Sequence, residues 1–371
     1  MIYRVPFVNY PAHYRQMESE IDAAIKEVLS KGDLILRHHV QDFESGVASF
    51  LGVRYAVGVS SGTDAMILSL HAAGIGQGDE IITVAHTFVA TIEAIVHCGA
   101  VPVLVDIGED FNMDVDELER AISPRTRAII PVHLNGRLCD MQKLMAIAQA
   151  HNLVVIEDAA QALGASFDGK KGGSFGLAGC FSFYPAKLLG AAGDAGLVCT
   201  NDEGFAEKIR LLRDHGRPST DKTKHVCYGF TGRLDNLQAA ILDVKFKYVP
   251  SWIQRRREIA SLYERGLVNI PGVKLPLPPS SNGRFFDVYQ NYVLRVSERD
   301  KLVPHLREKG IETIVSNPIP VHHQQALGLS HFHLPRTEQF AKKVISIPLI
   351  PEMSDEQAEY VIQTIRSFYV G

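Results

Sequence analysis

Short runs of apolar and β-branched residues alternate with stretches of helical periodicity along the first two-thirds of the chain. Strand-length runs occupy Tyr55–Val59, Glu80–Val84 and Val101–Val105, and helical stretches at Asp64–Ala73 and Thr91–Cys98 lie between them. This order of strand and helix favours a mostly parallel sheet with helices on both faces. Ligands of such sheets bind at the carboxyl ends of the strands, so residues that directly follow a strand are the first candidates for a functional site.

The same pattern continues to about residue 160 and then gives way to longer helices. Ala128–Val132 and Leu153–Ile156 are predicted strands, and Met141–Ala150 is the predicted helix between them. A long helical pattern over Arg233–Leu267 contains Pro250, and a proline inside a helix kinks or splits it. We therefore place a domain boundary near Pro250, with a large domain over residues 1–250 and a smaller α+β domain over residues 251–371.

The C-terminal third is predicted to contain both strands and helices. A proline-rich turn region runs from Pro271 to Gly283, and it is followed by a predicted strand at Tyr289–Val296 and a predicted helix at Lys301–Lys309. Asp355–Phe368 is the predicted terminal helix. The fold class expected from the whole pattern is α/β.

Composition excludes several classes of protein. Of the 371 residues, 46% are hydrophobic and 22% are charged, which is typical of a globular chain and excludes a disordered one. A net charge of −4 without basic blocks argues against nucleic acid as a partner. No apolar stretch approaches the roughly 20 residues of a membrane-spanning helix, and the first residues do not resemble a signal peptide. We therefore expect a cytoplasmic protein with no membrane partner. The five cysteines show no CxxC spacing, so we expect buried, reduced thiols and no metal site.

Three separate segments carry candidate functional residues. The small polar turn Ser60–Asp64 follows a predicted strand, and its free N–H groups suit a phosphate, although an ordinary N-cap has the same composition. Glu157 and Asp158 end a predicted strand, where a carboxylate either faces a ligand or serves as a cap or ion-pair partner. Lys187 lies among apolar and small residues, which would lower its pKa and free its amine as a nucleophile; the alternative is a lysine that extends into solvent.

One apparent nucleotide-binding loop is better explained as a turn. Gly164–Lys170 matches the pattern GxxxxGK, but Lys171 stands where a serine or threonine would bind Mg²⁺. The segment also does not run from a predicted strand into a predicted helix. We therefore predict a hairpin turn at Asp168–Gly169.

The three candidate segments together match the needs of pyridoxal phosphate. That cofactor requires a helix N-terminus for its phosphate, a lysine for its Schiff base and an acid beside its pyridinium nitrogen. Ser60–Asp64, Lys187 and Asp158 offer these groups. Phe88, soon after the predicted strand Glu80–Val84, would stack on the ring, although a core phenylalanine would have the same spacing.

At these residues the chain resembles the DegT/StrS-type sugar aminotransferases, which are fold-type I enzymes that depend on pyridoxal phosphate. The resemblance covers nearly the whole chain and implies a mostly parallel mixed sheet in a large domain with a smaller C-terminal domain. It rests on the motifs SGTDA (61–65), HTFVAT (86–91), PVHLNG (131–136), EDAAQA (157–162), SFYPAK (182–187), RDHG (213–216) and SIPLIP (346–351).

The resemblance implies a role for each matching residue. Lys187 would carry the cofactor and then move a proton between cofactor and substrate, while Asp158 would pair with the pyridinium nitrogen. Contacts to the rest of the cofactor would come from Gly62, Thr63, Phe88, Gln161, Ser182 and Thr231, with Gln161 near the 3-hydroxyl group. Contacts to the sugar would come from Tyr184, Arg233 and His322, although an ordinary loop histidine remains the alternative for His322. The family also implies a homodimer whose active sites lie at the subunit interface.

Two departures from the family pattern concern the substrate side. The segment Gly229–Arg233 has Thr231 where the family often has an asparagine that reaches the neighbouring subunit's phosphate, and a shorter hydroxyl can still donate directly or through water. Ser316-Asn317 replaces a histidine and tyrosine that are common in the family. The stretch GAAGDAG (190–196) resembles members that aminate carbon 3 of a keto sugar.

The function expected from the sequence is transfer of an amino group from L-glutamate to a nucleotide-linked keto sugar, with the pyridoxamine phosphate form of the cofactor as carrier. An aminotransferase for a cyclitol ketone or another non-nucleotide keto sugar is an alternative. A dehydratase that uses the same cofactor is disfavoured by Lys187, which such relatives typically replace. A non-catalytic regulatory protein on the same fold is a further alternative. The sugar, the nucleotide and the pathway stay open at this point.

Overall fold

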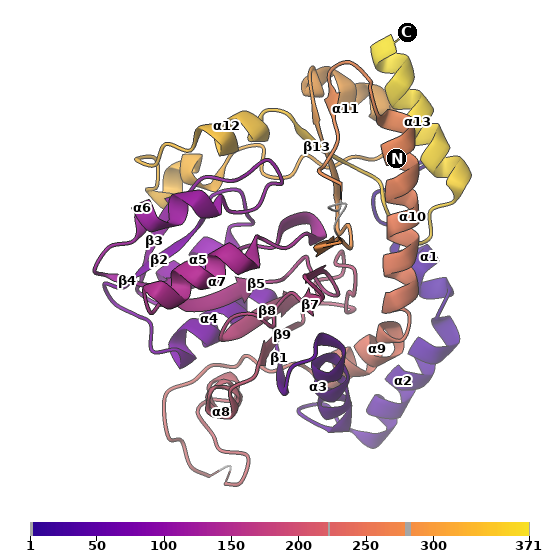
Figure 1. Cartoon of the computed structure of the whole chain (residues 1–371). Helices are drawn as coiled ribbons and strands as arrows, with labels where there is room; N and C mark the ends of the chain where they lie inside the picture. Colours follow the sequence, from indigo (N-terminus) through magenta and orange to yellow (C-terminus); the bar gives the residue numbers. More distant parts are fainter. Residues whose placement is uncertain (1–2, 222, 279–282, 371) are drawn as a thin grey trace.

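A seven-stranded sheet forms the centre of the larger part of the molecule (Figure 1). The structure is a computed structural model that describes residues 3–221, 223–278 and 283–370. The strand order is β1-β9-β8-β5-β4-β2-β3; β9 runs antiparallel to both of its neighbours, and the other pairs in this sheet are parallel. The strands are β1 (Tyr55–Val59), β2 (Glu80–Val84), β3 (Val101–Val105), β4 (Thr126–Ile129), β5 (Val154–Asp158), β8 (Ala178–Ser182) and β9 (Gly196–Thr200).

Helices cover both faces of this sheet, as the sequence pattern predicts. Successive residues of one strand enter different cores: Ile82 and Val155 pack in the core that contains α3 and α7, whereas Ile81 and Ile156 pack in the core that contains α4, α5 and α8. The alternation follows from the two-residue period of a strand, which puts neighbouring side chains on opposite faces. The bounds of these helices are α3 (His38–Leu51), α4 (Gly62–Ala72), α5 (Ala90–His97), α7 (Met141–Ala150) and α8 (Glu203–Arg213).

Three predicted strands, β1 to β3, and the helix α7 have the bounds that the sequence indicates. The predicted strand Ala128–Val132 is wrong in its bounds, because β4 ends at Ile129. Pro131 follows two residues later, and a proline has no N–H group to continue the hydrogen-bond ladder. The neighbouring strand β5 continues two residues beyond the prediction, to Asp158, whose N–H group donates to the carbonyl of Pro131 at 2.9 Å.

Pro250 separates two helices, as the sequence predicts. α9 (Asn236–Phe246) ends before it, and α10 (Val249–Leu267) begins with this proline in its first turn. α10 then packs against α13 (Asp355–Val370) beside a second sheet with the order β10-β12-β13. The domain boundary near Pro250 stays a prediction; Val5, near the N-terminus, packs in the same core as α10 and α13.

The second sheet begins its central strand later than expected. β12 covers Tyr292–Val296, three residues after the predicted start, because Tyr289 has a φ of +51° and cannot continue a strand. The flanking strands are β10 (Val273–Lys274) and β13 (Val344–Ile347). The helix predicted at Lys301–Lys309 is α11 (Arg299–Glu308), which begins two residues earlier and ends one residue earlier. In the proline-rich turn region that precedes β12, residues 279–282 lie outside the described residues.

The predicted hairpin at Asp168–Gly169 is confirmed. β6 (Ser166–Phe167) and β7 (Lys170–Lys171) pair antiparallel, and β11 (Phe285–Phe286) adds to them. Asp168 and Gly169 have φ angles of +48° and +79°, as a tight two-residue turn requires. The remaining elements are α1 (Tyr10–Arg15), α2 (Glu18–Lys31), α6 (Leu118–Ala121), α12 (Pro335–Ala341) and the 3₁₀ turns η1 (Val115–Glu117), η2 (Leu134–Gly136), η3 (Val321–His323) and η4 (Gln325–Leu327).

Two further expectations concern the cysteines and the membrane. Burial of the thiols is confirmed at Cys98, Cys139, Cys180 and Cys199, whereas Cys227 is exposed. Over the described parts of the chain, the model contains no helix with the length and apolar character needed to cross a membrane.

Candidate active site

The turn between β1 and α4 forms a cradle of backbone N–H groups. α4 begins at Gly62, and the hydroxyl oxygen of Ser61 accepts a hydrogen bond from the N–H group of Asp64 at 3.0 Å. Gly62 and Thr63 lie in the first turn of the helix, where the backbone N–H groups have no carbonyl acceptor within the helix. A Cβ atom at Gly62 would stand 2.7 Å from the Cβ atom of Ser182, so only glycine lets β8 approach so closely. The turn is therefore an N-cap, and it also has the arrangement that binds a phosphate.

Asp158 ends β5 at the carboxyl edge of the sheet. Its side chain is buried, and the hydroxyl group of Thr91 donates a hydrogen bond to Oδ2 at 2.8 Å. The N–H group of Ala160 donates to Oδ1 at 3.2 Å, and the hydroxyl of Thr87 lies 2.8 Å from that of Thr91. These contacts fix the direction of the carboxylate. The sequence analysis assigned no role to Thr91, although it belongs to the HTFVAT motif.

Glu157, the other carboxylate of this pair, supports the fold away from the cradle. It is fully buried, and it accepts hydrogen bonds from the N–H groups of Gly173, Phe175 and Gly176 at 2.7, 2.7 and 2.8 Å. The ring of His133 contacts it at 2.9 Å. Adjacent residues of a strand point to opposite faces of the sheet, so the carboxylate of Glu157 points away from the side on which the carboxylate of Asp158 lies.

Lys187 lies in the turn that follows β8. Because β8 pairs with β5 in parallel, Lys187, after β8, and Asp158, at the end of β5, lie at the same edge of the sheet. Burial lowers the pKa of the Lys187 amine, and the negative charge of Asp158 offsets part of this shift. Gln290 holds the turn from both sides: it accepts from the N–H group of Leu188 at 2.7 Å and donates to the carbonyl of Ala186 at 3.0 Å. The backbone is crowded after Lys187, since a Cβ atom at Gly190 would stand 2.3 Å from the carbonyl oxygen of Pro185.

Gln161 follows Asp158 by one turn and is held in place by two asparagines. Its Oε1 atom accepts from the N–H group of Asn135 at 2.8 Å and from the side-chain amide of Asn291 at 3.4 Å. Asn135 and Asn291 also contact each other at 3.2 Å. The sequence analysis missed Asn291 and Gln290, because each lies more than 100 positions from its partner and no local pattern connects them.

Two aromatic residues near these strand ends are exposed. The side chain of Phe88, after β2, is 67% exposed, so the alternative of a core phenylalanine is wrong. The side chain of Tyr184, two residues after the end of β8, is 53% exposed. Both rings are therefore available to a ligand or to a partner chain.

The segment that contains Thr231 and Arg233 lies beside the start of α4. The N–H group of Ser60 donates to the carbonyl of Gly232 at 3.0 Å. Arg233 donates to the carboxylate of Asp214 at 2.7 Å, and the hydroxyl of Thr231 lies 3.1 Å from Nε2 of His215. The polar end of Arg233 is therefore already paired within this chain.

His322 lies elsewhere, in η3. It is fully buried, and its described polar contact is with Glu338, at 3.4 Å. Burial lowers the pKa of its ring. The described contacts do not connect His322 with Asp158 or Lys187, so its contact with a sugar stays a prediction.

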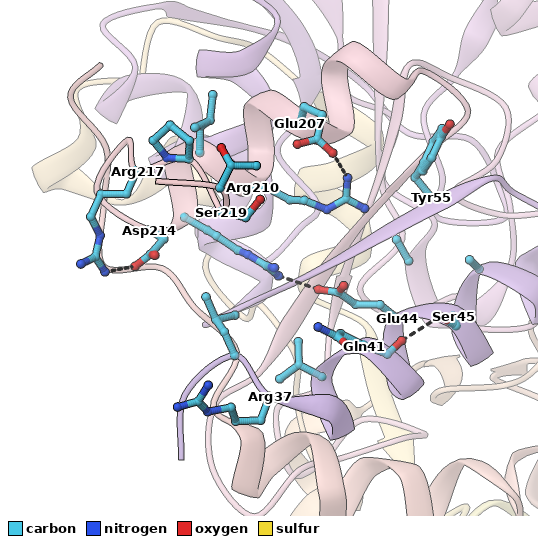
Figure 2. A pocket seen from close by; sticks show the side chains of 18 of the residues that line it. Arg37, Gln41, Glu44, Ser45, Tyr55, Glu207, Arg210, Asp214, Arg217 and Ser219 are labelled. Atoms are coloured by element: carbon cyan, nitrogen blue, oxygen red, sulfur yellow. Dashed lines mark hydrogen bonds and ion pairs between the residues drawn. The ribbon is translucent and has the colours of Figure 1, made fainter. Parts of the chain in front are cut away.

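A cavity of about 770 Å³ lies apart from Lys187 and Asp158, between α3, the start of β1 and α8 (Figure 2). Six of its charged side chains pair with one another, Arg210 with Glu207, Arg213 with Glu44 and Arg217 with Asp214. A cavity of about 50 Å³ lies at Lys187 itself.

The groups near Lys187 fit pyridoxal phosphate. The turn at Gly62 supplies free N–H groups for a phosphate, and the close approach of Ser182, whose Cβ atom would stand 2.7 Å from a Cβ atom at residue 62, brings a hydroxyl group beside them. Lys187 offers a buried amine, and Asp158 offers a fixed carboxylate whose negative charge acts on that amine. Gly62, Asp158, Ser182 and Lys187 thus come from three separate segments and meet at one edge of the sheet.

Comparison with known families matches residues 15–366 to the DegT/DnrJ/EryC1/StrS aminotransferase family. A pleiotropic regulatory protein of Geobacillus stearothermophilus is 42% identical, over 98% of both chains. The dTDP-3-amino-3,4,6-trideoxy-alpha-D-glucose transaminase of Streptomyces venezuelae is 40% identical, over 98% of this chain and 96% of the relative. The UDP-N-acetyl-3-dehydro-alpha-D-glucosamine 3-aminotransferase of Acidithiobacillus ferrooxidans is 41% identical, over 98% and 97%.

Solved structures agree with this result. The crystal structure of S. venezuelae DesV in complex with a ketimine intermediate superposes with a TM-score of 0.95 at 40% identity and covers 99% of both chains. The structure of NtdA from Bacillus subtilis with bound cofactor PMP gives a TM-score of 0.91 at 31% identity and covers 100% of this chain and 86% of that chain.

Proposed function

Because the chain belongs to the DegT/DnrJ/EryC1/StrS aminotransferase family, we propose that it transfers an amino group from L-glutamate to carbon 3 of a nucleotide-linked 3-keto sugar. The chain is a sugar aminotransferase that depends on pyridoxal phosphate. The observation that carries the proposal is the buried amine of Lys187, close to the fixed carboxylate of Asp158. Two observations favour carbon 3: the stretch GAAGDAG after Lys187, and the 3-amino and 3-dehydro sugars in the names of the relatives from S. venezuelae and A. ferrooxidans.

In the proposed mechanism Lys187 moves the proton. Bound pyridoxal phosphate supplies a carbonyl carbon that takes up the amino group and a ring that delocalises the electron pair left on deprotonation. Burial lowers the pKa of Lys187, so a larger fraction of its amine is neutral at a given pH and can accept a proton. The same amine, once protonated, returns the proton to the carbon that receives the amino group.

Other residues would bind the cofactor and orient it. The Asp158 carboxylate, held by Thr91, keeps a proton on the ring nitrogen and so favours electron withdrawal. The N–H groups of Gly62 and Thr63 and the hydroxyl of Ser182 would hold the phosphate. Phe88 would stack on the ring, and Gln161 would lie near its 3-hydroxyl group.

We further propose that the active site is completed in a homodimer. Tyr228 and Phe230, which flank Gly229, are exposed, and large exposed aromatic groups are typical of protein interfaces. Across such an interface Thr231 would reach the partner subunit's phosphate. Tyr184 and Arg233 are the residues we propose for contact with the sugar. His322 is fully buried against Glu338, which favours the alternative of an ordinary loop histidine over a contact with the sugar.

Absorption spectroscopy tests the cofactor half of this proposal. We expect purified protein with added pyridoxal phosphate to show a yellow band that L-glutamate bleaches, and Lys187→Ala to lose both the band and the bleaching. Lys171→Ala is the matched control, because burial also lowers the pKa of Lys171 but its amine binds the carbonyl of Phe50, away from the site. A bleaching reaction that survives in Lys187→Ala contradicts the role of Lys187.

The substrate half is tested by supplying matched 3-keto and 4-keto nucleotide sugars to the glutamate-treated enzyme. We expect the yellow band to return with the 3-keto sugar. Parallel initial-rate plots would agree with an amino group carried on the cofactor, and intersecting plots would contradict it. Return of the band with a cyclitol ketone alone would favour the non-nucleotide alternative. No transfer to any ketone would favour a regulatory role, which the name of the G. stearothermophilus relative mentions.

A further inference from the structure

Three histidines surround one carboxylate oxygen near the C-terminal part of the chain. Oε1 of Glu338 lies 3.4 Å from Nε2 of His322, 3.7 Å from Nε2 of His323 and 3.5 Å from Nδ1 of His333. The ligand atoms of His322, His323 and Glu338 also lie within 4.8 Å of one another. The expectation of no metal site rested on the spacing of the cysteines alone, and this cluster contains no cysteine.

The distances from Oε1 of Glu338 to the three histidine nitrogens match the distance between neighbouring ligand atoms of a tetrahedral metal site. With ligand nitrogen and oxygen atoms at about 2.0–2.2 Å from a zinc ion, tetrahedral geometry puts neighbouring ligand atoms about 3.4 Å apart. Hydrogen bonds between nitrogen and oxygen usually measure about 2.7–3.2 Å, so the three contacts are long for hydrogen bonds. Two imidazoles with one carboxylate are a common set of zinc ligands, and an open fourth position is common with it.

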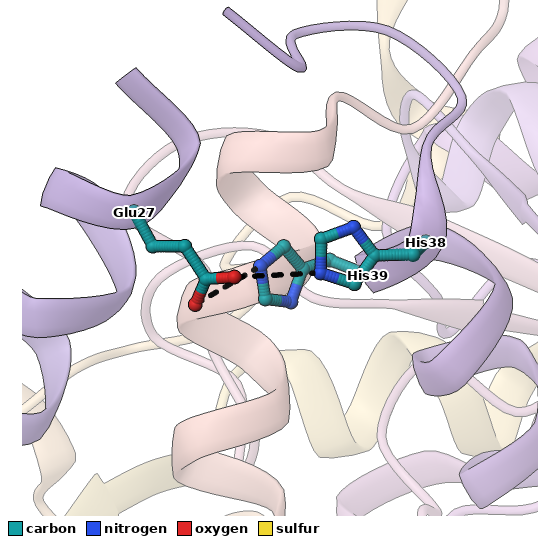
Figure 3. Close-up of side chains that lie close together, drawn as sticks. All are labelled: Glu27, His38 and His39. Atoms are coloured by element: carbon teal, nitrogen blue, oxygen red, sulfur yellow. Dashed lines mark ion pairs between the residues drawn. The ribbon is translucent and has the colours of Figure 1, made fainter. Parts of the chain in front are cut away.

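The carboxylate of Glu338 is available for a cation. Its ion pairs among the described residues are with histidines. A second cluster, of Glu27, His38 and His39 (Figure 3), differs in this respect, because the ammonium group of Lys31 lies 2.7 Å from Oε1 of Glu27 and already balances its charge. The contact from His39 to Glu27 is also longer, 4.0 Å, than any of the three histidine contacts to Glu338.

Both elements that carry the ligands are fixed in the core. At η3, the N–H group of Val321 approaches the carbonyl of Ala85 at 3.4 Å, and His322 beside it is fully buried. In α12, the hydroxyl of Thr337 donates to the buried carboxylate of Asp106 at 2.7 Å. Glu338 also accepts from the N–H group of Leu334 at 3.1 Å, which sets the direction of its side chain. Two of the ligands are therefore held in place before any ion binds.

We propose that His322, His323 and Glu338 bind a divalent transition-metal ion of the zinc class, and that His333, whose Nδ1 lies 3.5 Å from Oε1 of Glu338, moves in as a fourth ligand when the ion binds. Imidazole and carboxylate groups together favour Zn²⁺, Co²⁺ or Ni²⁺ over Mg²⁺ and Ca²⁺, which prefer oxygen ligands. The ion joins η3 to α12 and closes the segment 324–334 into a loop. It acts on this loop and takes no part in the amino-group transfer.

The test measures Zn²⁺ binding to the full-length protein, freed of metal with a chelator and loaded with pyridoxal phosphate. We expect one high-affinity Zn²⁺ per chain by titration calorimetry. In the double variant His323→Gln/His333→Gln the affinity should fall at least about tenfold, a change typical of a damaged metal site. Both of these histidines are exposed, so the variant is expected to fold like the parent protein.

Two controls make the result specific. His331→Gln removes an exposed histidine of the same loop that stacks on Phe332, and it should bind Zn²⁺ like the parent protein. His38→Gln/His39→Gln removes the second cluster and should also leave the affinity unchanged. Equal affinity in the parent protein and His323→Gln/His333→Gln would overturn the proposal. So would loss of the site in His38→Gln/His39→Gln.

A second measurement reports on the loop itself. Hydrogen exchange of the segment 324–334 should slow when Zn²⁺ is added to the parent protein, because an ion that binds only the closed loop stabilises it. The same ion should leave exchange in His323→Gln/His333→Gln unchanged. Slower exchange elsewhere in the chain without protection of this segment would contradict the proposed position of the ion.

Discussion

Replacing Thr91 with valine tests how the carboxylate of Asp158 is held. Thr91 is fully buried, and its hydroxyl is 2.8 Å from Oδ2 of Asp158 and 2.8 Å from the hydroxyl of Thr87. An ionised carboxylate only accepts hydrogen bonds, so Thr91 donates to Asp158 and Thr87 donates to Thr91. Valine has nearly the same shape as threonine, so the variant removes these two hydrogen bonds without leaving a cavity.

The expected effect follows from the charge on the acceptor. A hydrogen bond to a charged group contributes about 1.5–3 kcal/mol. Asp158 keeps the bond from Ala160, so we expect the lower end of this range, which corresponds to an increase of about tenfold in the Kd for pyridoxal phosphate. Thr91→Ser keeps the donor and should bind the cofactor nearly as the parent protein does. Thr87→Val leaves the bond to Asp158 in place and should have the smaller effect, less than about threefold.

The assay is an absorption titration of cofactor-free protein with pyridoxal phosphate, together with urea unfolding of each variant. Unfolding shows whether Thr91→Val has lost stability in general, and the titration shows whether the cofactor site has changed. The reasoning is refuted if Thr91→Val and Thr91→Ser bind the cofactor equally well. It is also refuted if Thr87→Val weakens binding as much as Thr91→Val does.

Two further predictions concern stability. Glu157→Gln should lower the free energy of unfolding by about 3–5 kcal/mol, because the buried side chain at this position loses the charge with which it binds His133 and three backbone N–H groups. An unchanged unfolding midpoint in guanidinium chloride would contradict this. Burial raises the pKa of Asp243 from the ordinary value of 3.8 to about 7. Between pH 3.8 and pH 7 the folded state therefore binds more protons than the unfolded state, and the free energy of unfolding falls as the pH rises through this interval. Asp243→Asn cannot ionise, so it should gain about 1–2 kcal/mol over the parent protein at pH 8 and lose this advantage below pH 4; thermal unfolding at both pH values measures the difference.

Much of the fold could be predicted from the order of apolar runs and breakers. The bounds of β1, β2 and β3 follow from their length and composition, and Pro250 marks the start of α10 as a proline in a first turn should. The errors arose where the backbone conformation depends on a neighbour. Pro131 ended β4 early, and the left-handed conformation of Tyr289 delayed β12.

The candidate site divides in the same way. Asp158 and Lys187 were predicted from their local surroundings, since a strand end and a run of small residues are visible in the sequence. Glu157 carried the same local signal as Asp158, and only the structure shows that its carboxylate binds the turn at Gly173. Sequence spacing gives the faces of a strand, but the choice between them depends on which elements pack on each face.

The sequence by itself determined the strand and helix order, the chemistry of the motif residues and the family resemblance. The tertiary structure decided which distant groups meet: Thr91 with Asp158, Asn291 with Gln161, and the histidines of η3 with Glu338 of α12. Periodicity and propensity act over a few residues, whereas these contacts join segments that come together only when the sheet and its helices have packed. The position of each side chain in the site is therefore a property of the whole fold.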